Sequence, residues 1–258
     1  ADRRAGRFLL GRPTGVLWPG RRVSGERDPG AQPEPCREGD DRIVDVVLLD
    51  FDGTITRRDT TRVLVFALLR ARPWRVLRVI APLFRLVAGG GPQQIQRAKD
   101  RCVGTLLKGL SFEQVRPNLQ CYRHDVLPLV IPEIYTLIRD RAATGQKVLV
   151  VTASAEHAVS GALEEFPVTV LGTRFEYGNG RFTGAVEGDG CFGPAKVQRI
   201  RVWADTQATP PQFIEAWSDS PSDLPMMALA KRRLWVCRDG DQDKFREQDP
   251  DGDIFLVQ

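Results

Sequence analysis

The sequence has little histidine and lacks any paired cysteine motif. It contains two histidines, His124 and His157, and its five cysteines include no C-x-x-C pair. A multi-histidine metal centre is therefore excluded, and neither a zinc site nor a disulfide framework is expected. Scattered cysteines of this kind are typical of proteins in a reducing cytoplasm.

Long apolar runs and an excess of one charge are missing as well. No stretch approaches the roughly 18 apolar residues that a membrane span needs, and the first residues lack the apolar segment of a secretory signal. The formal net charge is only +4, which gives no general case for nucleic-acid binding. With 42% hydrophobic and 27% charged residues, the chain is typical of a soluble globular protein, and we expect it in the cytoplasm.

Short apolar runs and helical stretches alternate from residue 43 onward. Strands are predicted at 43–50, 147–154, 168–173, 213–220 and 233–237, and helices at 155–166, 195–204 and 223–231. This alternation predicts an α/β fold with a doubly wound parallel sheet. The turn signal Gly178-Asn179-Gly180 predicts a β-hairpin within residues 174–186.

About ninety residues separate the first two predicted strands, far more than one crossover helix needs. Their period is helical, and Ser111 with Gln114 forms a capping-box pattern. We therefore expect a helical cap inserted after the first strand, where it could close over a ligand at the carboxyl edge of the sheet. The predicted division is a disordered extension at 1–41, a core at 42–57 and 144–240, a cap at 58–143 and a flexible acidic tail at 241–258.

Side chains able to bind a metal or a phosphate follow these strands and should meet at one edge of the sheet. They are Asp50 and Asp52 in "DFDGT", Thr152 and Ser154 in "VVTAS", Lys196 in "GPAKV", and Asp219 and Asp223 in "SDSPSD". Each has a structural alternative. The acids could end a strand in a turn, Lys196 could be an ordinary surface lysine, and for Ser154 a helix cap is the better interpretation.

Taken together, these side chains favour phosphoryl transfer. Four carboxylates without histidine or cysteine beside them suit Mg²⁺. A metal, a lysine and hydroxyl donors are the groups that surround a transferred phosphoryl group. A carboxylate can also act as the nucleophile and become an aspartyl-phosphate. The sequence therefore predicts an enzyme that binds a phosphomonoester.

The order and spacing of the four motifs resemble the haloacid dehalogenase superfamily, from residue 43 to about residue 237. The helical insertion, with "VVTASAEH" and "SDSPSDLPMMALA", is similar to its phosphoserine-phosphatase-like branch, subfamily IB. The resemblance implies that Asp50 attacks phosphorus, while Asp52 first protonates the leaving oxygen and then activates water. In this superfamily an acid at the position of Asp52 marks phosphate-ester chemistry. Dehalogenases lack this acid.

The resemblance also implies a ligand set. Mg²⁺ would be held by Asp50, by the backbone carbonyl of Asp52 and by Asp219. Asp223 would support the metal or Lys196. The phosphoryl oxygens would be bound by Thr152 and Lys196.

The substrate is less clear from the sequence. In phosphoserine phosphatases an acid nine residues after the nucleophile contacts the substrate amine, and Asp59 stands at that place; a residue that stabilises the first turn of a helix is an equal interpretation. The cap arginine of those enzymes is displaced, because Val103 stands at its place and Arg101 lies two residues away. Phosphoserine is therefore disfavoured. Thr54 and Ser154 are further expected substrate contacts.

The stretch "RARPWRVLRVIAPLFRLVAGG" suggests a second possibility. Its arginines and apolar residues recur at helical spacing: Arg72, Arg75, Arg78 and Arg85, with Trp74, Leu77, Ile80, Phe84 and Val87. Such a helix could lie on an anionic membrane surface or pack its apolar side inward. The pattern is similar to phosphatases of the phosphatidylglycerophosphatase C type. We therefore prefer a lipid head-group phosphate, such as phosphatidylglycerophosphate at the inner face of the membrane, over a soluble metabolite. A phosphotransferase remains an alternative, and a non-catalytic binding protein is least favoured.

Overall fold

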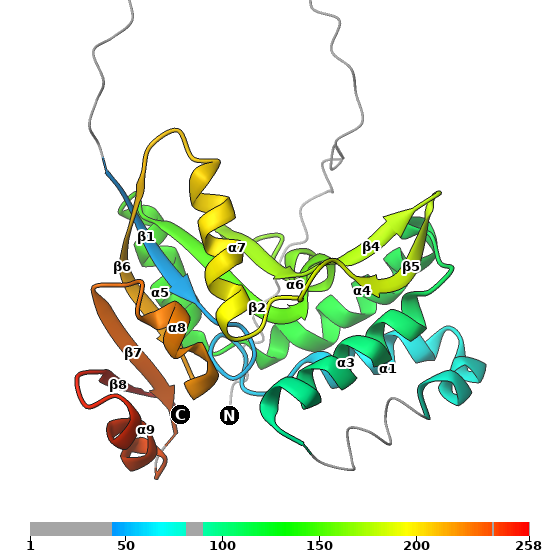
Figure 1. Cartoon of the computed structure of the whole chain (residues 1–258), viewed down its shortest axis with the longest axis horizontal. Coiled ribbons are helices and arrows are strands. Elements are labelled where there is room, and N and C mark those ends of the chain that lie inside the picture. The colour runs from blue at the N-terminus through cyan, green and yellow to red at the C-terminus, as the bar shows by residue number, and fades with distance from the viewer. Residues whose placement is uncertain (1–42, 81–89, 239, 258) are drawn as a thin grey trace, which may run out of the picture. The chain divides into compact units, whose positions relative to one another are not determined.

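The computed structural model describes residues 43–80, 90–238 and 240–257. Its centre is a six-stranded sheet in the order β3-β2-β1-β6-β7-β8, and every pair of neighbours is parallel. The strands are β1 (Val44–Leu49), β2 (Lys147–Ala155), β3 (Val168–Thr173), β6 (Pro211–Ser218), β7 (Arg232–Cys237) and β8 (Asp253–Leu256). The predicted fold class is confirmed (Figure 1).

Helices cover both faces of this sheet, as a buried parallel sheet requires. On one face lie α5 (Pro132–Ala143) and α6 (Glu156–Ala162), and on the other lie α7 (Pro194–Asp205), α8 (Leu224–Met227) and α9 (Gln242–Gln248). Successive residues of β1 point to opposite faces. Val47 and Leu49 belong to one hydrophobic cluster, and Val46 and Leu48 belong to the other. The apolar run before Asp50 thus joins the two cores.

The predicted insertion is helical where the structure describes it. It contains α1 (Thr61–Arg70), η1 (Pro73–Arg75), α3 (Pro92–Leu107), α4 (Phe112–Val126) and η2 (Leu127–Leu129), and it ends with α5. Helix α1 packs against α3 and α4, and α4 packs against α6, whereas α5 packs against β2 of the sheet. The capping box at Ser111 and Gln114 is confirmed, because both of its hydrogen bonds are present.

The predicted hairpin is confirmed as β4 (Phe175–Gly178) and β5 (Arg181–Val186). Asn179 and Gly180 connect the strands with φ of 51° and 75°, the left-handed conformation that a tight hairpin turn needs. Strand β5 contacts α3 where two glycines meet. A Cβ atom added to Gly104 would lie 2.2 Å from the carbonyl oxygen of Gly184. This close approach fixes α3 against the hairpin.

The C-terminal segment departs from prediction. Residues predicted as a flexible acidic tail form α9 and β8, and β8 pairs with β7 at the edge of the sheet. Asp249 receives two hydrogen bonds from Arg233, at 2.8 and 2.7 Å, and one from Trp235 at 3.0 Å. The flexible-tail prediction is wrong because it weighed the acidic composition and overlooked the short apolar run Ile254-Phe255-Leu256.

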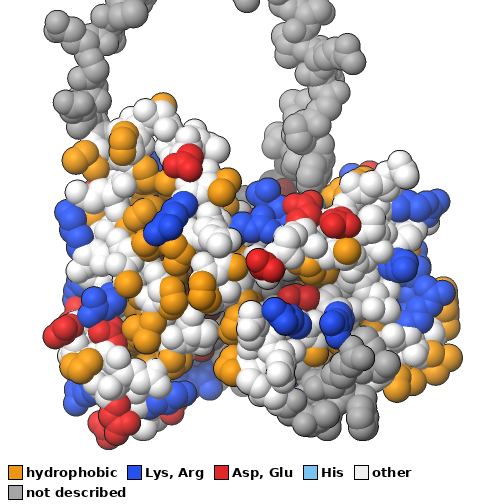
Figure 2. Space-filling view, viewed as in Figure 1, with side chains coloured by type: hydrophobic (Ala, Val, Ile, Leu, Met, Phe, Trp, Pro, Cys, Tyr) orange, Lys and Arg blue, Asp and Glu red, His pale blue; other side chains and the backbone are white. Residues whose placement is uncertain are grey.

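Apolar side chains are exposed at the end of α1 and just beyond it. Phe66 is 68% exposed, Trp74 65%, Leu77 72% and Ile80 55%. Figure 2 shows hydrophobic side chains gathered over this edge. Inward packing of this stretch is therefore wrong for Trp74, Leu77 and Ile80, whereas Val79 is buried. The predicted positions Phe84, Arg85 and Val87 lie outside the described residues. Among the helices that the structure describes, none is long and apolar enough to cross a bilayer.

Candidate active site at the carboxyl edge of the sheet

A cavity of about 480 Å³ lies at the carboxyl ends of the central strands. Asp50 directly follows β1, and its backbone N–H donates to the carbonyl of Trp217 on β6, so the two loops leave the sheet side by side. The cavity is lined by most of the predicted site residues: Asp50, Asp52, Asp59, Ser154, Lys196, Asp219 and Asp223. The structure therefore brings these positions together from five segments of the chain.

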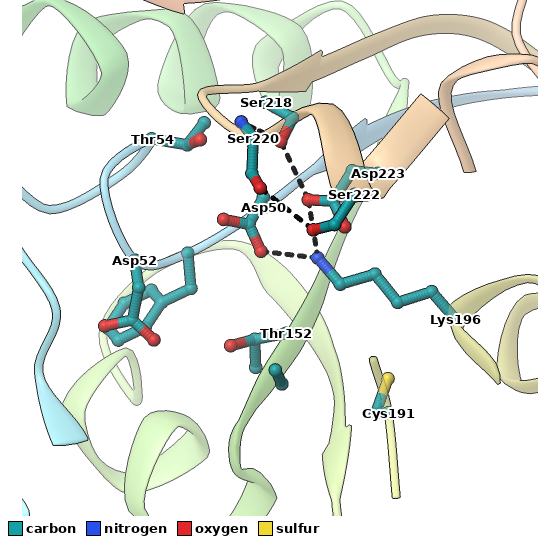
Figure 3. Close-up of polar contacts among 12 residues, drawn as sticks. Asp50, Asp52, Thr54, Thr152, Cys191, Lys196, Ser218, Ser220, Ser222 and Asp223 are labelled. Carbon is teal, nitrogen blue, oxygen red and sulfur yellow. Dashed lines mark hydrogen bonds and ion pairs between the residues drawn. The ribbon is translucent and has the colours of Figure 1, made fainter. Parts of the chain in front are cut away.

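Lys196 lies at the centre of the site. Its Nζ donates to Oδ1 of Asp50 at 2.6 Å and to Oδ2 of Asp223 at 2.8 Å. It is 2% exposed, so the alternative of a surface lysine is wrong. Burial alone would lower the pKa of Lys196, but the two carboxylates raise it on balance, and the side chain stays cationic. Figure 3 shows Asp50 and Asp223 on either side of the ammonium group.

Ser218 fixes the second of these carboxylates. Its hydroxyl donates to Oδ2 of Asp223 at 2.7 Å and accepts from the backbone N–H of Ser220 at 3.1 Å. Asp223 therefore receives hydrogen bonds from Lys196 and Ser218 and is 2% exposed. Its contacts are those of a residue that positions Lys196.

Asp219 lies directly over Gly53. A Cβ atom added to Gly53 would lie 1.9 Å from Oδ2 of Asp219, and the φ of Gly53 is +90°, so a side chain there would be both crowded and strained. The backbone N–H of Asp219 donates to the hydroxyl of Thr54 at 3.0 Å. Thr54 is fully buried and does not line the cavity in the described part of the chain. In the structure Thr54 positions Asp219, and its contact with a substrate stays a prediction, as does that of Thr152, which is also buried and is not among the lining residues of the described chain.

The side chain of Asp52 lies apart from Lys196 and Asp223 (Figure 3). One oxygen accepts from the hydroxyl of Ser154 at 2.5 Å, and the other accepts from the backbone N–H of Thr60 at 2.6 Å. Burial raises the pKa of Asp52, and the charge of Asp59 raises it further, while the two hydrogen bonds oppose the shift. A carboxyl group with a raised pKa is suited to donating a proton.

Ser154 does not cap a helix, contrary to prediction. It lies within β2, and the N-cap of α6 is Ala155, which has no side-chain cap. The hydroxyl of Ser154 instead donates a hydrogen bond to Asp52. Thr152, two residues earlier, is buried, and its hydroxyl accepts from the backbone N–H of Ser154 at 3.0 Å.

Asp59 is paired with a lysine that the sequence analysis missed. Lys99 on α3 donates to Oδ2 of Asp59, and the backbone N–H of Thr61 donates to Oδ1 at 2.8 Å. Burial alone would raise the pKa of Asp59, but these hydrogen bonds and the charge of Lys99 lower it on balance. Gln96, three residues earlier on α3, lies on the same helix face and also lines the cavity, a relationship that the sequence alone does not show. Arg101 is exposed and is not among the lining residues within the described segments.

The donor atoms at this edge are oxygens, as Mg²⁺ prefers. In the described ranges no three side chains of histidine, cysteine or acidic residues are arranged as a metal site, and the ligand set of Asp50, Asp52, Asp219 and Asp223 stays a prediction. Asp50 and Asp219 lie near enough for the charge of Asp219 to raise the pKa of Asp50. Burial raises the pKa of Asp219 to about 6, and Asp223 adds to the shift. Burial likewise raises the pKa of Asp50, to which Asp223 and Asp219 contribute and which Lys196 opposes. A divalent cation between Asp50 and Asp219 would relieve this repulsion, so the residues fit such an ion.

The fold and the site define an α/β enzyme fold of the haloacid dehalogenase type. A structure from Bordetella pertussis Tohama I, of unknown function, matches with a TM-score of 0.70 at 20% identity over 83% of this chain and 99% of that one. A phospho-aspartyl intermediate analogue of phosphoserine phosphatase matches with a TM-score of 0.54 at 19% identity over 84% and 94%. At such identities the likeness shows the fold alone.

The sequence gives the family. Residues 47–228 match the model of the haloacid dehalogenase-like hydrolases, and the chain belongs to this family. A probable phosphatase of Mycobacterium tuberculosis is 33% identical over 144 residues, which cover 55% of this chain and 50% of that protein. The match thus spans about half the length of that relative.

Proposed function

We propose that this chain is a Mg²⁺-dependent phosphatase of the phosphoserine-phosphatase-like branch, subfamily IB, which hydrolyses phosphomonoesters through an aspartyl-phosphate on Asp50. The observation that carries the proposal is the buried ammonium group of Lys196, bound to both Asp50 and Asp223, with Asp52 lining the same cavity. The naming of the mycobacterial relative as a probable phosphatase supports it.

In the first step an oxygen of Asp50 attacks phosphorus, and the bond from phosphorus to the ester oxygen breaks. The leaving oxygen takes its proton from Asp52, whose raised pKa favours the protonated form. Lys196 lies 2.6 Å from Asp50, where its charge would offset that of the phosphoryl oxygens. Thr152 is the proposed hydroxyl donor to the same oxygens.

In the second step Asp52, now ionised, takes a proton from water as the water oxygen attacks phosphorus. The bond between Asp50 and phosphorus breaks, which releases phosphate and restores both acids. Ser154 and Thr60 hold the carboxylate of Asp52 in one orientation through both steps.

The side chains of Asp50 and Asp219, with the backbone carbonyl of Asp52, are the proposed ligands of Mg²⁺. The bound cation would supply charge stabilisation for the phosphoryl group. Gly53 and Thr54 contribute by placing the carboxylate of Asp219 over the loop that carries Asp50 and Asp52.

Phosphate release from p-nitrophenyl phosphate with Mg²⁺ tests this proposal. Asp50→Asn should abolish turnover, because an amide is a far poorer nucleophile than a carboxylate. Asp45→Asn is the matched control, since Asp45 lies on β1, the strand that leads to Asp50, and is not among the residues that line the cavity; this variant should keep wild-type turnover. Near-normal turnover of the Asp50→Asn variant would refute the nucleophile assignment.

A lipid head-group phosphate, with phosphatidylglycerophosphate as the model, is the preferred substrate, and a soluble phosphomonoester is the alternative. The exposed side chains of Phe66, Trp74 and Leu77 support the lipid, because such groups gain free energy by entering the acyl boundary of a membrane. Arg72 and Arg78 lie in the same stretch and would attract anionic head groups. The proposed location of the enzyme is accordingly the inner, cytoplasmic face of a membrane.

Sedimentation with anionic vesicles tests the lipid proposal. The wild type should sediment with them, and the double variant Trp74→Ser/Leu77→Ser should remain in the supernatant while it keeps its turnover of p-nitrophenyl phosphate. If the protein neither binds these vesicles nor dephosphorylates lipid phosphates, the lipid proposal is refuted and the soluble phosphomonoester is the substrate class.

A separate experiment distinguishes a phosphotransferase from a hydrolase. Alcohols are added as acceptors, and the products are analysed for phosphoryl transfer to the alcohol instead of to water.

A further inference from the structure

Beyond the proposed reaction centre, the lining of the cavity is rich in cations. Five charged residues form the proposed reaction centre: Asp50, Asp52, Lys196, Asp219 and Asp223. The other charged residues that line the cavity within the described ranges are five basic and two acidic ones: Arg57, Arg58, Lys99, Arg238 and Lys244, with Asp59 and Asp241. Figure 2 shows basic side chains over α3, the helix that carries Lys99. The leaving group of a substrate would occupy this basic part.

The negative charge of Asp59 is already paired with a cation of the protein. Its Oδ2 accepts from Lys99 and its Oδ1 from the backbone N–H of Thr61. An amine would have to share this carboxylate with a lysine of the same charge, held by the fold itself, and would gain less than at an unpaired acid. The ion pair therefore weakens the attraction of Asp59 for a cationic or zwitterionic leaving group.

Lys99 keeps donors for a ligand. An ammonium group has three N–H donors, and Asp59 is the partner found for it in the described part of the chain. The side chain is 26% exposed and lines the cavity, so a ligand can reach it. Its position is fixed, because α3 is held against the hairpin where Gly104 meets Gly184.

We propose that the substrates of this enzyme are phosphomonoesters whose leaving group carries a second anionic group, a carboxylate or a phosphodiester, and that Lys99 binds this group. The inference rests on the proposed phosphatase function and specifies its substrate class. Lys99 is thus a specificity-determining residue, and Asp59 holds it in place and attenuates its charge.

Two substrates of nearly equal size test the charge preference. 3-Phosphoglycerate and glycerol 3-phosphate differ only in a carboxylate against a hydroxymethyl group. The ratio of their kcat/KM values should favour 3-phosphoglycerate by about tenfold or more, as a hydrogen bond to a charged group contributes. Phosphoethanolamine, with a cationic leaving group, should be the poorest of the three.

Variants of the ion pair should move this ratio in opposite directions. Lys99→Gln should lower it about tenfold or more, because the cation is lost. Asp59→Asn should raise it, because Lys99 is no longer neutralised, while the amide can still accept from the backbone N–H of Thr61. Lys231→Gln is the control, since Lys231 is exposed and outside the cavity, and its ratio should equal that of the wild type. If Asp59→Asn instead lowers the turnover of phosphoethanolamine selectively, Asp59 binds amines and the inference is overturned.

Turnover of p-nitrophenyl phosphate separates the two levels of the proposal. If the wild type releases phosphate from it but shows no preference for 3-phosphoglycerate, the inference fails and the phosphatase function stands. If this ester and every other monoester are inert, the phosphatase function itself fails. Phosphatidylglycerophosphate in detergent micelles and its deacylated form carry the same phosphodiester. Faster turnover of the lipid assigns the anion to a lipid head group, and equal turnover assigns it to a soluble ester.

Discussion

The Nζ atom of Lys196 lies 2.6 Å from Oδ1 of Asp50, although 146 residues separate the two in the sequence. Asp50 directly follows β1, one of the two central strands of the sheet, and Lys196 lies in the first turn of α7, which covers one face of that sheet. The pair is buried together with Asp223. Loss of this lysine would leave two buried acids without a counter-ion, which would destabilise the fold. In the proposed reaction the same lysine would supply a cation to the phosphoryl group.

Lys196→Ala should lower kcat by about two to three powers of ten, because one charged donor to the transition state is lost. The variant should also melt at a lower temperature, since Asp50 and Asp223 are left buried without their counter-ion. Phosphate release and thermal unfolding measure the two effects. Lys231→Ala should change neither, and a Lys196→Ala enzyme with wild-type kcat would remove Lys196 from the proposed chemistry.

Gly53→Ala should strongly impair turnover although it adds only a methyl group. The new Cβ would lie 1.9 Å from Oδ2 of Asp219 at a φ of +90°, so the carboxylate must move. The Mg²⁺ concentration that gives half-maximal activity should rise. Gly178→Ala is the control, because nothing lies within 4 Å of its added Cβ. Equal Mg²⁺ dependence in the Gly53→Ala variant and the wild type would show that Gly53 does not place a metal ligand.

Removal of divalent cations should abolish turnover, and added Mg²⁺ should restore it. Mg²⁺ should also raise the melting temperature, because a ligand that binds the folded state alone stabilises it. Its charge would also offset the burial and the negative charge of Asp223, which together raise the pKa of Asp219. Asp219→Asn should lose both the activity and most of this thermal shift. Thermal unfolding with and without Mg²⁺ measures the shift, and an unchanged shift in Asp219→Asn would place the cation elsewhere.

Asp249→Asn should lower the free energy of unfolding by about 1.5–3 kcal/mol near neutral pH, the cost of losing hydrogen bonds to a charged group. The hydrogen bonds from Arg233 lower the pKa of Asp249. Burial acts in the opposite direction, and the hydrogen bond from Trp235 lowers the pKa further. A group whose pKa is lower in the folded protein than in the unfolded chain stabilises the fold at pH values above its unfolded pKa. This stabilisation is lost as the pH falls through the pKa of the folded protein. Urea unfolding should therefore show the two proteins converging below about pH 4. Equal stability at pH 7 would mean that α9 and β8 do not depend on this cluster.

The sequence predicted the sheet and the positions of most site residues because both follow local rules. Apolar runs predicted the strands, and the acids at their ends necessarily met at one edge, as Asp50 and Asp219 do. The partners of those acids were not predictable in this way. The pairing of Lys99 with Asp59 depends on how α3 packs against α1 and the hairpin, and the hydroxyl of Ser154 serves Asp52 instead of a helix. These contacts arise from tertiary packing, which residue spacing does not encode.

Covalent phosphorylation of Asp50 is the central claim, and acid quenching during turnover tests it most directly. Wild-type enzyme quenched with substrate and Mg²⁺ should carry one phosphoryl group, sensitive to hydroxylamine, on the peptide that contains Asp50, and mass spectrometry should find none on the Asp50→Asn protein. Rapid phosphate release with a phosphoryl group on another residue, or with hydroxylamine never intercepting an acyl phosphate, would contradict the account.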